Sequence, residues 1–137
     1  MPDPADIPSG FFISTDTNNR IAAAPAIGFG PNGYGAVTQL TSKTQGVTVN
    51  AKCGVITMHN AALASLATVQ FTCTNSAISA TDVVVVSVGT GGTAGAYQAH
   101  CITVGAGTCV FRVSNVSGGS LSEAVTVNFA VIDTPAS

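Results

Sequence analysis

Short segments in which apolar and polar residues alternate dominate the chain from Gly33 to Ile132. In Val69–Thr74 and Val125–Val131 every second residue is apolar, as expected for a β-strand with one buried and one solvent-facing side. Linkers rich in glycine, serine and threonine, such as residues 89–93 and 117–120, separate these segments. About seven or eight strands of this kind predict an all-β fold, an antiparallel β-sandwich with jelly-roll-like connections.

Two segments depart from this pattern. Val83–Val88 is apolar on both of its sides, so we expect this strand to be central in a sheet or to lie in an interface. Ala61–Ala67 is the one segment with helical potential, and it is short. The sequence therefore predicts almost no helix outside that region.

Only ten of the 137 residues carry a formal charge, four of them Lys or Arg and six Asp or Glu. This is 7% of the chain, against about a quarter in an average soluble domain. The mean hydropathy is +0.46, yet no apolar run approaches the roughly 20 residues of a membrane-spanning helix. Because so few charges give little repulsion between close neighbours, we expect a surface that is covered by copies of this chain or by a larger assembly.

The charge distribution disfavours nucleic acid as a partner. The basic residues Arg20, Lys43, Lys52 and Arg112 are scattered, whereas binding to a track of phosphates requires clustered cations. The acidic, proline-rich residues 1–6 lack the basic and apolar regions of a signal peptide, so we expect synthesis in a cytoplasm and no contact with a membrane.

Residues 1–33 differ in composition from the remainder of the chain. They hold five of the six prolines and three of the six acidic residues. We therefore predict two parts, an N-terminal arm (residues 1–33) and a β-sandwich domain (residues 34–137). An alternative for the first part is a strand that packs on the chain's own core. The apolar anchors that we expect to contact another subunit or an assembly are Phe11, Phe12, Ile13 and Ile21.

Residues that could carry chemistry are few. The chain has two histidines, His59 and His100, and one glutamate, Glu123, and it lacks the G-x-S-x-G motif of serine hydrolases. The glycine-rich residues 89–95 lack the lysine of a phosphate-binding loop. No C-x-x-C pair is present to favour a zinc site. We predict no catalytic residue, no cofactor and no metal.

The four cysteines are expected to be free thiols. Cys73 and Cys109 share strand faces with apolar residues, so we expect them to be buried. Only Cys101 and Cys109 are expected to be able to form a late disulfide. A three-residue turn at 104–106 would place them opposite each other, whereas a two-residue turn at 105–106 would place Cys109 opposite Ile102.

Several segments resemble a module found in structural proteins of tailed bacteriophages and prophages. The resemblance covers residues 33 to 132 and includes GTAGAY at 92–97 and SLSEA at 120–124. It implies no catalytic motif. The other resembling segments are residues 35–39, 41–50, 54–58, 61–63, 71–72, 74–76 and 128–132.

The resemblance covers modules of capsid surfaces and of fibres, and the arm and the charge-poor body favour a capsid decoration (cement) protein. Such a protein binds the outer surface of the major capsid shell, often as a homotrimer, and stabilises it on the virion. Its partners are the major capsid protein and further copies of itself. The alternative is a fibre or spike module that binds a host surface glycan. An enzyme acting on surface polysaccharide fits less well, because aromatic residues make up 6% of the chain and Trp is absent.

Overall fold

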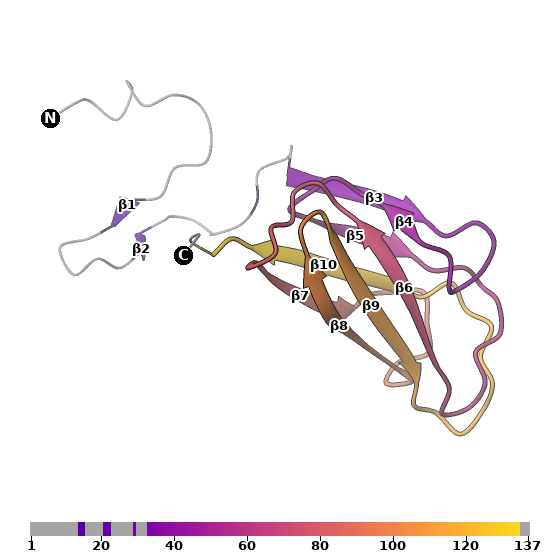
Figure 1. The fold of residues 1–137 in the computed structure, drawn as a ribbon. Coiled ribbons are helices and arrows are strands. Elements are labelled where there is room, and N and C mark those ends of the chain that lie inside the picture. The colour runs from indigo at the N-terminus through magenta and orange to yellow at the C-terminus, as the bar shows by residue number, and fades with distance from the viewer. Residues whose placement is uncertain (1–13, 16–20, 23–28, 30–32, 135–137) are drawn as a thin grey trace, which may run out of the picture.

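Two four-stranded sheets form the body of the protein. The computed structural model describes residues 14–15, 21–22, 29 and 33–134. The first sheet has the strand order β3-β5-β10-β7, and the second has the order β4-β6-β9-β8 (Figure 1). The first sheet comprises β3 (Tyr34–Thr38), β5 (Cys53–Thr57), β10 (Thr126–Ile132) and β7 (Val83–Val88). The second comprises β4 (Val47–Thr48), β6 (Thr68–Thr74), β9 (Thr108–Asn115) and β8 (Tyr97–Gly105). A separate antiparallel ladder pairs β1 (Ser14–Thr15) with β2 (Ile21–Ala22).

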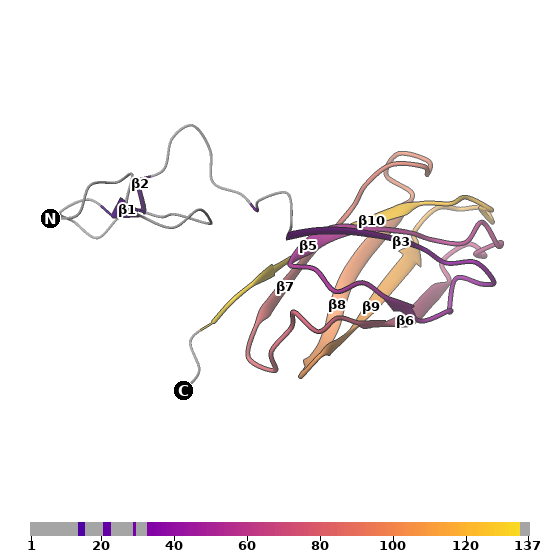
Figure 2. The ribbon, with the colours of Figure 1, turned by 90° about the horizontal axis from the view of Figure 1, so that it is seen from above.

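The two sheets pack against each other as two layers around a shared apolar core (Figure 2). Phe111 of β9 lies at its centre and is fully buried. Its ring centroid is 5.6 Å from that of Phe71 on β6 and 6.1 Å from that of Phe129 on β10 in the facing sheet. Because alternate residues of each strand point into this core, the structure confirms the predicted all-β fold and its sandwich-like packing.

The prediction of purely antiparallel sheets is wrong, since each sheet contains one parallel pair. β3 runs parallel to β5, and β4 runs parallel to β6. The chain leaves the first sheet after β3, passes through β4 in the second, and returns to begin β5 beside β3. Glycines permit the close approach of this pair, because a Cβ on Gly54 would lie 2.0 Å from the carbonyl oxygen of Gly35.

The hairpin between β8 and β9 has a register that differs from both expected ones. Its turn is Ala106–Gly107, with a φ of 73° at Gly107. This turn places Cys109 opposite Val104, and a β-bulge between Cys101 and Thr103 then shifts the register so that Cys101 lies opposite Phe111. Across the other edge of β9, Cys109 lies directly opposite Cys73. Both expected partners of Cys109, Cys101 for a three-residue turn and Ile102 for a two-residue turn, are therefore wrong. All four cysteines are free.

Two further expectations concern residues 83–88 and 61–67. Val83–Val88 forms β7, which is the last strand of the first sheet, so it is not central; the alternative, that it lies in an interface, stays a prediction. Residues 61–67 form no helix, because Leu63 instead pairs with Leu121 through backbone hydrogen bonds of 2.8 and 3.1 Å. Leu66 in this segment has a φ of 59°, which is incompatible with a right-handed helix. Within residues 34–134 the structure contains no helix.

Candidate interaction surfaces

The arm residues predicted to make contacts are mostly outside the part that the structure describes. Phe11, Phe12 and Ile13 lie outside the described residues, and Ile21 is located in β2, where its backbone pairs with Thr15. Their role as contact residues therefore stays a prediction. Phe29, just before the body, is described and is 47% exposed.

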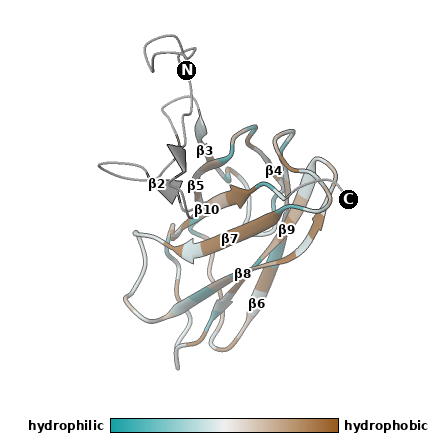
Figure 3. Cartoon of the chain, turned by 90° about the vertical axis from the view of Figure 1, so that its left-hand side faces the viewer, coloured by the Kyte–Doolittle hydropathy of each residue, from teal (hydrophilic) through white to brown (hydrophobic). Residues whose placement is uncertain are grey.

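The outer face of the first sheet carries an apolar patch that sequence reasoning did not identify. Cross-strand register brings Tyr34 beside Cys53, Cys53 beside Ala130, and Ala130 beside Val85, with Ile132 beside Val83 in the next row. Tyr34, Val83, Val85 and Ile132 are each half-exposed or more, at 50% to 58%. We call these six residues the apolar outer patch. Figure 3 shows β7 and β10, which supply four of them, largely in brown.

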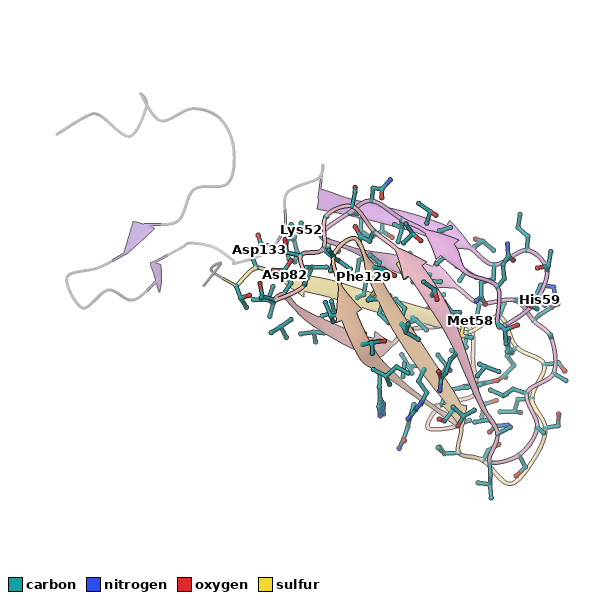
Figure 4. All side chains as sticks on the ribbon, in the orientation of Figure 1. Lys52, Met58, His59, Asp82, Phe129 and Asp133 are labelled. Atoms are coloured by element: carbon teal, nitrogen blue, oxygen red, sulfur yellow. The ribbon has the colours of Figure 1, made fainter. Side chains whose placement is uncertain are left out.

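A cluster of three ionic side chains lies beside one end of this patch (Figure 4). Lys52, which precedes β5, donates hydrogen bonds to the carboxylate of Asp133 and to the carbonyl oxygen of Ala77, the latter at 2.6 Å. Its Nζ is also 4.0 Å from Oδ2 of Asp82. The cluster ties together the ends of β5, β10 and β7, and it gives the apolar outer patch a polar rim.

The opposite end of the sandwich is held by a buried lysine. Lys43 is 3% exposed, and its Nζ donates to the carbonyl oxygens of His59 at 2.5 Å and Glu123 at 2.6 Å. Burial lowers the pKa of Lys43, and the charge of Glu123 partly opposes this effect. Through these two contacts, Lys43 links the backbone at His59 to the backbone at Glu123 in another loop.

Glu123 and Tyr97 complete this end of the body. The Glu123 carboxylate accepts hydrogen bonds from the backbone N–H of Thr93 at 3.0 Å and from its hydroxyl at 2.7 Å. The Tyr97 hydroxyl is buried and has no hydrogen-bond partner among the described residues. Burial and the nearby Glu123 carboxylate raise the pKa of Tyr97 to about 12. The phenol therefore stays protonated at physiological pH.

The outer face of the second sheet is polar instead. Arg112 on β9 lies between Gln70 of β6 and His100 of β8 in one cross-strand row, and all three are exposed. Arg112 forms no ion pair with another described residue. The outer face of the first sheet thus carries an apolar patch and no charge, whereas this row of the second sheet is polar and holds one cation.

The described part of the chain contains no cluster of potential metal ligands. Among those residues no group of three or more His, Cys, Asp or Glu side chains could hold a metal ion. His59 accepts a hydrogen bond at Nδ1 from the backbone of Ala61 at 3.0 Å, so this nitrogen is engaged in a turn. None of the described segments forms a helix of the length and apolarity needed to cross a membrane.

Comparison of the chain with protein-family models, with curated proteins and with solved structures finds no match.

The carboxyl groups of Asp82 and Glu123 predict how the stability of the fold depends on pH. Backbone N–H groups, of Ser79 at Asp82 and of Thr93 at Glu123, lower the pKa of both carboxyls below their ordinary values of 3.8 and 4.5. Such groups stabilise the folded state above the ordinary pKa and lose this contribution as pH falls through the folded-state pKa. We expect Tm, measured by calorimetry, to fall steeply as pH drops below 4.5.

Substitutions test which groups cause this loss. Asp82→Asn should flatten the acid limb of the profile, because the amide does not titrate, while the exposed control Ser87→Asn should leave it unchanged. An unaltered acid limb in Asp82→Asn would show that other groups set the acid stability.

Proposed function

We propose that the protein is a bacteriophage capsid decoration (cement) protein, which binds the outer surface of the major capsid shell and stabilises it without catalysis. It acts on the virion after assembly in the host cytoplasm. Its partners are the major capsid protein and other copies of itself, most simply as a homotrimer. It needs neither nucleic acid nor a membrane. Support comes from the resemblance of residues 33–132 and from the surface described above.

One observation carries this proposal, the near-neutral surface of the body. The structure describes six of the ten charged residues. Five of the six lie in two clusters, one around Lys52 and the other around Lys43, and Arg112 is the sixth. With these five charges engaged with one another or with the backbone, the first sheet presents an uncharged outer face that carries the apolar outer patch, and the second presents one cation, Arg112. Such a surface costs little to desolvate against another protein. The five clustered residues are Lys43, Lys52, Asp82, Glu123 and Asp133.

Two finer structural features belong to the same proposal. The chain crosses between the layers after most strands, which supports jelly-roll-like connections for the body. Residues 1–33 act as an extended arm, with Phe11, Phe12, Ile13 and Ile21 as its anchors. Arms of this kind give affinity through apolar anchors and edge-strand pairing without a deep pocket.

The distribution of the protein on purified particles tests the proposal. A decoration protein should cover the shell, so a cryo-EM map should show it at repeated positions on every capsid face. Density confined to a single vertex or tail would contradict decoration. Sedimentation of the free protein at micromolar concentration should show an oligomer, and a monomer would contradict the homotrimer.

A fibre or spike module that binds a host glycan is the second candidate, favoured by the polar row of Gln70, Arg112 and His100. Amide and guanidinium groups on a flat face can hydrogen-bond sugar hydroxyls or a sugar carboxylate. Arg112→Ala should then abolish retention on host-derived polysaccharide. If decoration is the function instead, Arg112→Ala should leave shell binding unchanged.

A further inference from the structure

The apolar outer patch has the composition of an interface core. The outward-facing side chains of β3, β5, β7 and β10 include no charged residue, and the ionic cluster of Lys52, Asp82 and Asp133 stands at one end. An apolar centre with a polar rim is the arrangement found in specific protein interfaces. Burying half-exposed side chains of this size is favourable in proportion to their apolar area.

The N-terminal arm joins the body at this patch. The chain passes from Phe29 through Gly33 into Tyr34, which is both the first residue of β3 and a member of the patch. The Cys53 thiol, in the middle of the patch, donates to the carbonyl oxygen of Gly33 at 3.4 Å. Arms of assembled copies therefore start beside the patches that they could cover.

The arm also has the reach and the chemistry to cover a patch on another copy. Twenty residues separate Ile13 from Gly33. Because the β1–β2 ladder pairs Ser14 with Ala22, the reach from the anchors to Gly33 is set by the eleven residues that follow Ala22, which span about 36 Å at roughly 3.3 Å per residue. Crossing four neighbouring strands needs only about 15 Å, at roughly 4.8 Å per step. The apolar anchors Phe11, Phe12 and Ile13 match a surface that carries no charge.

We propose that the apolar outer patch is the docking site for the N-terminal arm of a neighbouring copy of this chain. The described residues of the body leave the four largest side chains of this patch at least half-exposed. Exchange of arms between copies buries both apolar surfaces at once. The inference rests on the self-association included in the proposed function, and it does not depend on which shell the oligomer binds.

Site-specific cross-linking tests the docking, because Cys53 places a native thiol in the patch. Cys101→Ser is introduced in all chains to remove the other half-buried thiol. A chain carrying Phe12→Cys and Cys53→Ser is mixed with a size-tagged chain that retains Cys53, and the mixture is oxidised with diamide. We expect a disulfide between the two chains, which denaturing electrophoresis and mass spectrometry identify.

The matched control moves the acceptor thiol to the polar sheet. A tagged chain with Cys53→Ser and Thr72→Cys presents an exposed thiol on β6, and we expect little cross-linking to it. Equal yields at both positions would refute the docking. A further chain carries Phe12→Cys and retains Cys53, so it holds both thiols. If a disulfide formed only within this chain and never between chains, the docking would also be refuted, because the arm would then cover its own body.

A second variant tests the same face without thiol chemistry. Val85→Asp puts a charge in the patch at a half-exposed position, so the fold should tolerate it, as circular dichroism would verify. We expect this variant to sediment as a monomer and Thr72→Asp to remain oligomeric. An intact Val85→Asp oligomer would contradict the inference. The cross-linking and sedimentation assays contain no shells. A negative result in them would therefore refute the arm docking without refuting shell binding, and a failure to bind shells would not refute the arm docking.

Discussion

Deleting residues 2–20 is expected to abolish binding to undecorated shells while leaving the body folded. The buried core consists of residues between Val47 and Val131, so the deletion removes none of it. It does remove Phe11, Phe12 and Ile13, which we propose make the contacts between copies or with the shell. Loss of multivalent engagement alone would lower the apparent affinity by about 10²–10⁴-fold.

Shell binding is measured by co-sedimentation, and folding is checked by circular dichroism. Replacing Phe11, Phe12 and Ile13 together by serine should reproduce the loss at full chain length, whereas Thr15→Ser and Thr17→Ser together should not. If the truncated protein bound shells with the affinity of the full chain, the contact would have to lie on the sandwich, and the role of the arm would be disproved.

The largest expected loss of stability comes from Phe111→Ala. Phe111 is fully buried and packs edge-to-face on Phe71 within its own sheet and against Phe129 of the other. Truncating a core phenylalanine costs about 3–5 kcal/mol, because it removes buried area and leaves a cavity. Native domains have only about 5–15 kcal/mol in total. Phe111→Ala should therefore lower the free energy of unfolding by a large fraction of its total value.

Urea unfolding at a fixed protein concentration measures this effect, since self-association also stabilises the fold. The control Thr72→Ala, at an exposed position on the neighbouring strand, should change the free energy of unfolding by no more than about 0.5 kcal/mol. Comparable losses in the two variants would mean that the contact between the sheets does not carry the stability assigned to it.

Individual strands were predictable because alternation is a local property. The alternating residues 69–74 lie within β6, and residues 125–131 largely coincide with β10. Pairing partners were not predictable in the same way, because they depend on how the chain crosses between layers. The parallel β3–β5 pair results from the excursion through β4. Likewise, the turn places Cys109 opposite Val104, and the turn and the bulge together place Cys101 opposite Phe111.

The arm anchors and the apolar outer patch also differ in how far the sequence alone could predict them. Sequence reasoning named the arm anchors, which stay a prediction, and it recognised that Val83–Val88 is apolar on both sides. It missed the apolar outer patch, although the exposed side of that strand contributes Val83 and Val85 to it. Tyr34 and Ile132 stand near the two ends of the body in the sequence, each about 50 residues from this strand. Nothing in the sequence links either residue to it.

The all-β class and the low charge follow from the sequence alone, because composition and a period of two residues can be read without any long-range contact. Which uncharged surfaces face outward, and which residues meet on them, depends on how the strands pair in the fold. Register across β3, β5, β10 and β7 assembles the apolar outer patch from four distant segments. A shift of one residue in any of these strands would turn its patch residues into the core, so the patch is a property of the pairing.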